Sequence, residues 1–275
     1  MVLFLWIGVE QGSAETLVIL SSPGLAAPLQ ALGSAFEATQ SGVWVRVVVE
    51  EALDMRRRIA AVENQPSWAE AGLRGPIHLI APGGDELIAR LEQKAYVLPN
   101  SRQAYAAVSL VLVAPESVVE APNSFEALAR DPALRVAVAD PVLTALGQQT
   151  RELVAGLGLT EALGHRLDVA TDVEGVLSHL LNGQADVGIV FGPDAYRYRE
   201  RIRMTAVAPE RVVKPVLHSL AMVRSCPNRE LGQAFLNFVR TAEAQAVLVA
   251  LGYGLPGSGD ARLGAGMPSG GEVRR

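Results

Sequence analysis

The feature that most constrains this chain is a repeated alternation of short apolar runs with amphipathic stretches. After the apolar run at residues 17–20, apolar residues recur at helical spacing, at Leu25, Leu29, Leu32 and Phe36. Alternation of this kind is typical of parallel sheets whose two faces are both covered by helices. The sequence therefore predicts an α/β fold. The runs expected to be strands are 17–20, 43–49, 77–81, 109–113, 135–139, 187–191 and 217–223.

The expected helices follow the strand ends. They begin after Ser21-Ser22-Pro23-Gly24, near Ala52, at Glu86, near Leu146 and after the capping pair Thr171-Asp172. The last apolar stretch, 230–251, predicts one long helix with its inner face formed by apolar side chains. Helix N-termini that open at strand ends carry unpaired N–H groups and a partial positive charge, which suit an anion.

Composition excludes several classes of function. A formal net charge of −5 argues against nucleic acid as a partner, because phosphate backbones require a basic face. The single cysteine, Cys226, excludes an intramolecular disulfide and a cysteine-based zinc site. The four histidines have no metal-ligand spacing, and no nucleophile elbow, Walker loop or dinucleotide motif occurs. The sequence thus predicts a protein that is not an enzyme and has no cofactor or metal.

Both ends of the chain differ from the α/β pattern. The apolar run Val2–Val9, with small residues at Gly12 and Ala14, predicts an export signal over residues 1–14 and a periplasmic or otherwise extracytoplasmic protein; a buried strand is the alternative. Residues 63–75 are expected to form a surface insertion. The Gly-rich residues 257–275 have too few apolar side chains to offset their ordering entropy, so a disordered tail is expected.

An ordered series of motifs resembles a known family over about residues 15–256. The series consists of Ala139-Asp140-Pro141, residues 171–177 (TDVEGVL), residues 183–191 (GQADVGIVF), the stretch from Asn228 to Gln245 and Leu251-Gly252-Tyr253-Gly254. Together these motifs are similar to the periplasmic molybdate-binding proteins of ABC importers. The resemblance implies a two-lobed type II periplasmic-binding-protein fold with two crossover strands and a ligand cleft between the lobes. Lobe one would be 15–105 with 218–256, and lobe two 106–217.

The resemblance also implies a set of ligand-binding positions, at which the chain departs from the family. Two serines of the family fall on Gly24 and near Ala52, and its tyrosine falls on Phe191, so three hydroxyls are replaced. Acidic residues at Glu50, Glu51 and Asp54 would repel an anion nearby. The expected ligand-binding residues are Ser22, Gly24, Ala52, Leu146, Gly147, Val173 and Phe191, with most contacts made by backbone N–H groups.

Two functional interpretations follow. In the first, the protein binds a small oxyanion, molybdate or tungstate, and delivers it to an ABC permease. In the second, the scaffold serves as an accessory or partner subunit of another extracytoplasmic complex without tight molybdate binding. Because a hydrogen bond to a charged group contributes about 1.5–3 kcal/mol, losing three hydroxyls weakens oxyanion binding by orders of magnitude.

Overall fold

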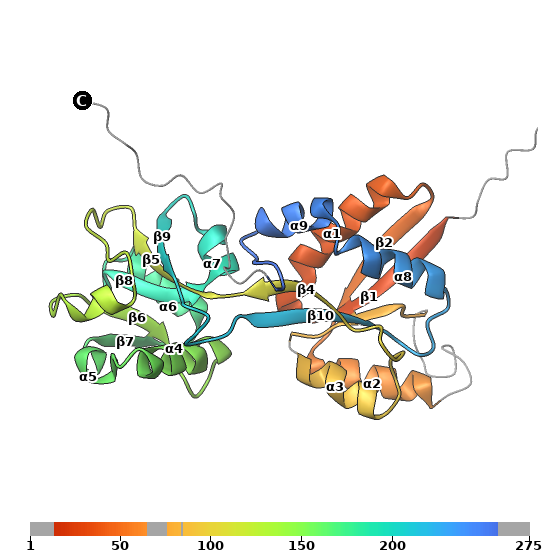
Figure 1. The fold of residues 1–275 in the computed structure, drawn as a ribbon, viewed down its shortest axis with the longest axis horizontal. Coiled ribbons are helices and arrows are strands. Elements are labelled where there is room, and N and C mark those ends of the chain that lie inside the picture. The colour runs from red at the N-terminus through yellow and green to blue at the C-terminus, as the bar shows by residue number, and fades with distance from the viewer. Residues whose placement is uncertain (1–13, 65–75, 84, 258–275) are drawn as a thin grey trace, which may run out of the picture. The chain divides into compact units, whose positions relative to one another are not determined.

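The computed structural model describes residues 14–64, 76–83 and 85–257. In this part of the chain there are two compact units: residues up to Gln103 with Leu220–Ala244, and Ala104–Ser219 with the described residues from Gln245 onward. The chain passes between the units at three points, which lie inside strand β4 (Gln103–Val108), strand β10 (Val216–Met222) and helix α9 (Ala242–Val249) (Figure 1).

Three sequence predictions fall almost wholly outside the described residues. They are the export signal at 1–14, the surface insertion at 63–75 and the tail at 257–275. The predicted lobe one also included residues 245–256, whereas the structure groups the residues from Gln245 onward with the second unit.

The first sheet has the strand order β2-β1-β3-β10-β4. β1 (Glu15–Ser21) pairs in parallel with β2 (Val43–Val49) and with β3 (Leu79–Ala81), and β10 joins β3 in the antiparallel direction. The last residue of β1 lies opposite the last residues of both parallel neighbours. The carboxyl ends of these three strands therefore meet at one edge of the sheet, where helix N-termini and ligands gather in open α/β sheets.

The helices of this first unit are η1 (Pro23–Leu25, a 3-10 turn), α1 (Ala26–Thr39), α2 (Ala52–Glu63), α3 (Asp85–Gln93) and α8 (Arg229–Phe238). An aromatic cluster holds the C-terminal helix α8 against the N-terminal helix α1. The Phe36 ring lies 5.2 Å from that of Phe235, edge to face, and 5.3 Å from that of Phe238. The cluster joins segments that are about 200 residues apart in sequence.

The prediction of one long helix over 230–251 is wrong, because two helices occupy this stretch. α8 ends at Phe238, and α9 (Ala242–Val249) begins after a short break. Thr241 makes the break: its hydroxyl donates to the Phe238 carbonyl (2.8 Å) and accepts from the Ala244 N–H (3.3 Å). One side chain thus ends the first helix and caps the second.

The second unit contains a sheet of order β7-β6-β8-β5-β9. β6 (Val136–Ala139) lies between β7 (Leu167–Ala170) and β8 (Val187–Phe191) and is parallel to both. β5 (Leu110–Pro115) runs antiparallel to β8 and to β9 (Ile202–Val207). Every residue of β5 and β6 is buried, as expected for strands covered on both faces. The remaining elements are η2 (Glu126–Ala129), α4 (Ala145–Gly156), α5 (Thr160–Leu163), α6 (Val173–Leu181) and α7 (Gly192–Arg197).

A buried histidine in the first unit makes stability depend on pH. His78 is 3% exposed, and its Nδ1 accepts a hydrogen bond from the N–H of Val18 (3.1 Å), so Nδ1 carries no proton. Burial lowers the pKa of His78 from 6.5 to about 4. Between pH 6.5 and about 4 the unfolded chain binds a proton at this residue, whereas the folded chain does not. The free energy of unfolding should therefore fall between pH 6.5 and about 4, by roughly 2–3 kcal/mol from this residue.

Urea unfolding of wild type and His78→Asn across this pH range tests the prediction. Asn has no titrating ring but retains a side-chain oxygen that can accept the Val18 N–H. The free energy of unfolding of His78→Asn should therefore fall less on acidification than that of wild type. His165→Asn, at an exposed position, is the matched control and should follow the wild-type profile. Parallel profiles for wild type and His78→Asn would contradict the assignment.

Candidate functional site

The turn after β1 forms the first part of the candidate site. The Ser22 N–H donates to the Ala81 carbonyl (3.1 Å), and the Ser22 carbonyl accepts from Leu25 N–H (3.1 Å), so the turn is tied to the end of β3. Ser22 precedes η1 but its hydroxyl makes no capping bond. Gly24 lies inside η1, not at the start of α1; it is exposed, and a Cβ there would meet no atom within 4 Å. A larger side chain therefore fits at this position.

The N-terminus of α2 forms the second part. Ala52 is the first helical residue and is exposed, and the preceding Glu51 makes no side-chain cap. The first backbone bond of the helix runs from the Met55 N–H to the Glu51 carbonyl (2.9 Å). The N–H groups at the very start of α2 have no acceptor within the helix, as at any helix N-terminus, and they suit an anion.

The acidic residues around α2 are not equivalent. The Glu50 side chain is 13% exposed and forms an ion pair with Arg58, which is carried by α2. The second carboxylate oxygen, Oε2, and the Arg58 Nε are buried without a partner in the described part of the chain. Asp54 is exposed, 3.5 Å from Arg57. Because Arg58 offsets the charge of Glu50, that residue repels an anion less than the sequence alone suggests.

In the second unit, Asp140 and Thr144 organise the turn between β6 and α4. Asp140 Oδ1 accepts the N–H groups of Val142 (2.7 Å) and Leu143 (3.2 Å). The Thr144 hydroxyl donates to the Asp140 carbonyl (2.9 Å), and its oxygen accepts the N–H of Gly147 (2.9 Å). One of the N–H groups expected to hold a ligand, that of Gly147, is therefore already occupied by a helix cap.

Leu146 and Gly147 have packing roles at the start of α4. Leu146 is 5% exposed and belongs to the hydrophobic core of this unit. A Cβ on Gly147 would lie 2.3 Å from the Asp140 carbonyl oxygen and 2.4 Å from that of Ala139. The absence of a side chain at Gly147 is thus what allows α4 to begin directly against the end of β6.

The start of α6 keeps two backbone donors available. Asp172 caps the helix, with its Oδ1 accepting the N–H of Gly175 (2.9 Å). The first intrahelical bond runs from Val176 to the Asp172 carbonyl. The N–H groups of Val173 and Glu174 therefore have no partner among the hydrogen bonds of the described chain, and Val173 itself is half-buried.

Neighbouring donors partly offset the negative charge of the acidic side chains near α6 and α7. Arg197 donates to Glu174 (2.6 Å) and to Asp194 (3.2 Å), and the Tyr198 hydroxyl donates to the other Glu174 oxygen (2.8 Å). Burial raises the pKa of Asp194, Arg197 opposes this shift and Glu174 adds to it. Phe191, which ends β8 immediately before α7, is half-buried and packs against the core. It offers only an aromatic ring at the position where the sequence resemblance implies a tyrosine hydroxyl.

Each unit gathers its own candidate residues at the carboxyl edge of its sheet. In the first unit the Glu50 N–H donates to the Ser21 carbonyl (2.9 Å), and this hydrogen bond joins the ends of β2 and β1. In the second unit the Asp140 N–H donates to the Ala170 carbonyl (2.8 Å), and this hydrogen bond joins the ends of β6 and β7. Sequence reasoning did not identify Arg58 or Ser109 as relevant to these edges. A Thr three residues before Gly147 was the available signal for the cap. The predicted residues at the first edge are Ser22, Gly24 and Ala52, and those at the second are Leu146, Gly147, Val173 and Phe191.

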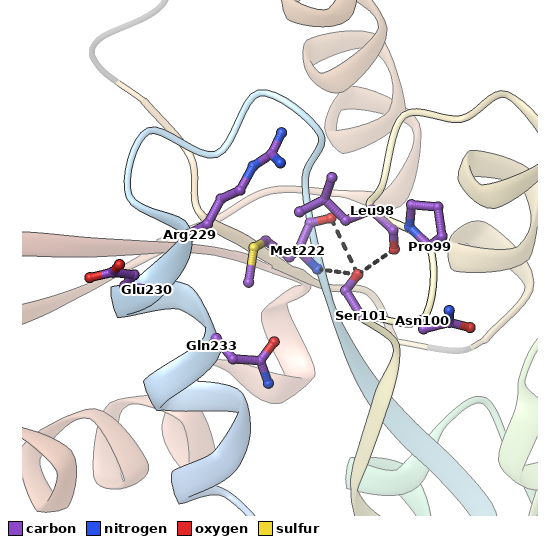
Figure 2. Close-up of a pocket in the computed structure, with 8 residues that line it drawn as sticks. All are labelled: Leu98, Pro99, Asn100, Ser101, Met222, Arg229, Glu230 and Gln233. Carbon is purple, nitrogen blue, oxygen red and sulfur yellow. Dashed lines mark hydrogen bonds between the residues drawn. The ribbon is translucent and has the colours of Figure 1, made fainter.

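A separate pocket of about 320 Å³ lies in the first unit (Figure 2). Its lining comes from the loop after α3, from Met222 and from the first turns of α8. The Ser101 hydroxyl donates to the Leu98 carbonyl (2.7 Å) and accepts the Met222 N–H (3.0 Å), so its polar group serves the loop. None of the sequence-predicted site residues lines this pocket. The lining residues are Leu98, Pro99, Asn100, Ser101, Met222, Arg229, Glu230 and Gln233.

The described ranges lack two further kinds of feature. No group of three or more His, Cys, Asp or Glu side chains that could hold a metal ion occurs in residues 14–64, 76–83 and 85–257. Within the same ranges, every helix is too short or too polar to cross a bilayer.

Comparison with known proteins identifies the family. Residues 17–254 match the family described as bacterial extracellular solute-binding protein. The chain is 26% identical over 208 residues to the molybdate-binding protein ModA of Escherichia coli. The aligned region covers 74% of this chain and 79% of ModA. It is 24% identical over 250 residues to ModA of Mycobacterium tuberculosis H37Rv, covering 90% of this chain and 88% of that protein.

Solved structures agree on the fold. A substrate-binding domain from Clostridium difficile superposes with a TM-score of 0.77 at 19% identity, over 87% of this chain and 98% of that one. The periplasmic molybdate-binding protein of Azotobacter vinelandii gives 0.60 at 21% identity, over 87% and 99%. These likenesses confirm the predicted α/β periplasmic-binding-protein fold. The chain belongs to the bacterial extracellular solute-binding proteins.

Proposed function

We propose that the protein binds a small oxyanion, with molybdate or tungstate as first candidates, and delivers it to the permease of an ABC importer outside the cytoplasm. The observation that carries the proposal is the pair of N–H groups without a partner in the described chain at Val173 and Glu174, at the carboxyl ends of the parallel strands β7, β6 and β8. Backbone donors at a helix N-terminus bind oxyanions without any cationic side chain. The molybdate-binding relatives add independent support for this ligand class.

The proposed site is weaker than a site with three further hydroxyl donors. Gly24, Ala52 and Phe191 supply no hydroxyl, and Thr144 already uses the Gly147 N–H. At about 1.5–3 kcal/mol for each hydrogen bond to a charged ligand, three absent hydroxyls lower affinity by at least about a thousandfold. Ser22, whose hydroxyl makes no capping bond, is the side-chain donor that we assign to the first unit.

A thermal-shift panel of molybdate, tungstate, sulfate and phosphate tests the proposal. For a dissociation constant near 10 µM, 1 mM ligand is about 100-fold above it and stabilises the fold by about 2.7 kcal/mol, or roughly 5–10 °C. Sodium chloride at matched ionic strength and putrescine are the controls and should leave the melting temperature unchanged. Stabilisation by putrescine and by none of the oxyanions would refute the ligand class.

A second candidate function is supported by an exposed apolar turn. Val142 is 85% exposed and Leu143 is 67% exposed, and Asp140 holds both N–H groups, so the turn is fixed. Exposed apolar side chains on a fixed turn suit contact with another protein. The accessory-subunit interpretation therefore competes, and the same panel separates the two, because a protein that serves only as a partner subunit gains no stability from any anion.

A further inference from the structure

Ser109 has an unusual hydroxyl. The residue is 5% exposed, and its Oγ is buried without a hydrogen-bond partner in the described part of the chain. A buried hydroxyl without a partner destabilises the folded state, so its presence calls for a physical reason. Ser109 joins β4 to β5 and was not among the site residues expected from the sequence.

Strand pairing places Ser109 beside the position of the replaced tyrosine. In the β5–β8 pair, Leu110 lies opposite Phe191 and Val111 lies opposite Val190. The Gly192 N–H donates to the Ser109 carbonyl (3.1 Å), which continues this register by one residue. Ser109 therefore lies opposite Gly192, immediately after Phe191, and Gly192 has no side chain to cover it.

Alternation along the strand places the Ser109 side chain on the face of the sheet that α6 covers. Ser109 shares a face with Val111 and, through the pairing, with Gly188. A Cβ on Gly188 would lie 2.8 Å from Leu180 Cδ1 and 3.1 Å from Val176 Cγ1, so α6 packs on this face. α6 lies over this sheet in Figure 1.

The position along α6 follows from the rise of strands and helices. Gly192 is four residues beyond Gly188, about 13 Å along the strand. The same distance corresponds to about nine residues of helix. Counted back from Leu180 toward the N-terminus, nine residues reach Thr171, two residues before Val173, the first residue of α6. Because α6 begins at the carboxyl end of β7, which is parallel to β8 across β6, Ser109 lies at the level of the N-terminal end of α6, on the face of the sheet that α6 covers.

We propose that Ser109 Oγ donates a hydrogen bond to the oxyanion held by the Val173 and Glu174 N–H groups. This inference rests on the proposed oxyanion-binding function. The neighbouring acids do not prevent it: Asp172 is engaged by the Gly175 N–H, and Glu174 by Arg197 and Tyr198. The site thus combines one buried hydroxyl with two helix donors.

Calorimetric titration of the full chain with molybdate and with tungstate tests the assignment. Ser109→Ala should weaken binding by about 10- to 100-fold, and Ser109→Cys, which preserves the shape with a poorer donor, should weaken it similarly. Thr150→Val is the matched control, because its Oγ1 is also buried without a partner but lies in the second turn of α4. Its affinity should equal that of wild type.

Urea unfolding without ligand separates binding from folding. Ser109→Ala removes an unpartnered buried hydroxyl, so its stability should equal or exceed that of wild type. Wild-type affinity in Ser109→Ala would overturn the inference and leave the proposed function standing. An equal loss of affinity in Thr150→Val would overturn it as well. Absence of binding of any oxyanion by wild type would instead refute the proposed function, and the role of Ser109 with it.

Discussion

Gly147→Ala is expected to lose at least about 3 kcal/mol of folding free energy, a large effect for removing no contact. The new Cβ would lie 2.3–2.4 Å from two backbone carbonyl oxygens, of Asp140 and Ala139. Backbone cannot swing aside as a side chain can, so α4 must move away from β6 and lose packing of Leu146. Urea unfolding followed by far-UV circular dichroism measures the loss.

Gly24→Ala is the matched control for that substitution. A Cβ at Gly24 would meet no atom within 4 Å, and the backbone at this position does not require glycine. Ala should therefore change the free energy of unfolding by less than about 0.5 kcal/mol. If Gly147→Ala proved as stable as Gly24→Ala, the close approach of α4 to the end of β6 would be refuted.

The triple variant Gly24→Ser, Ala52→Ser, Phe191→Tyr is expected to bind molybdate at least about a thousandfold more tightly than wild type. Each change adds a hydroxyl at a position where the sequence resemblance implies one, and each hydrogen bond to a charged ligand contributes about 1.5–3 kcal/mol. Space exists for the first change, since Gly24 is open, and Ala52 is exposed. Single variants should gain much less, because one added donor leaves the site incomplete.

The control for the triple variant alters the same surfaces without adding the ligand hydroxyls. Gly24→Ala with Ala52→Gly and Phe191→Leu changes the same three positions and should not raise affinity. Calorimetric titration with molybdate compares the two. Equal affinity of the triple variant and wild type would show that these positions do not contact the ligand.

Much of the fold could be predicted from the sequence because its central strands are continuous apolar runs. β5 and β6 are wholly buried, and their composition alone indicates this. The short strand β7 (LDVA) was not predicted, since three of its four residues are partly or fully exposed and no apolar run marks it. The break between α8 and α9 was also missed, because Thr241 is one polar residue inside a helical pattern.

The candidate site was less accessible to sequence reasoning. Helix starts near Ala52 and Val173 could be located from strand ends and capping residues. The interactions of the individual groups could not be predicted from the sequence. The Gly147 N–H donates to the Thr144 hydroxyl oxygen, and Arg58 offsets the charge of Glu50. The buried hydroxyl of Ser109 depends on pairing with β8, a contact between residues about 80 positions apart, which no local pattern reveals.

The most direct test of a retained scaffold with a weakened oxyanion site is calorimetric titration of the wild-type protein with molybdate at fixed, physiological ionic strength. We expect a dissociation constant of about 1 µM or weaker, because Val173 and Glu174 supply backbone donors while three hydroxyls are replaced. A dissociation constant of about 10 nM or tighter would contradict this expectation, since it would require more side-chain donors than Ser22 and Ser109, and Gly24, Ala52 and Phe191 cannot provide them.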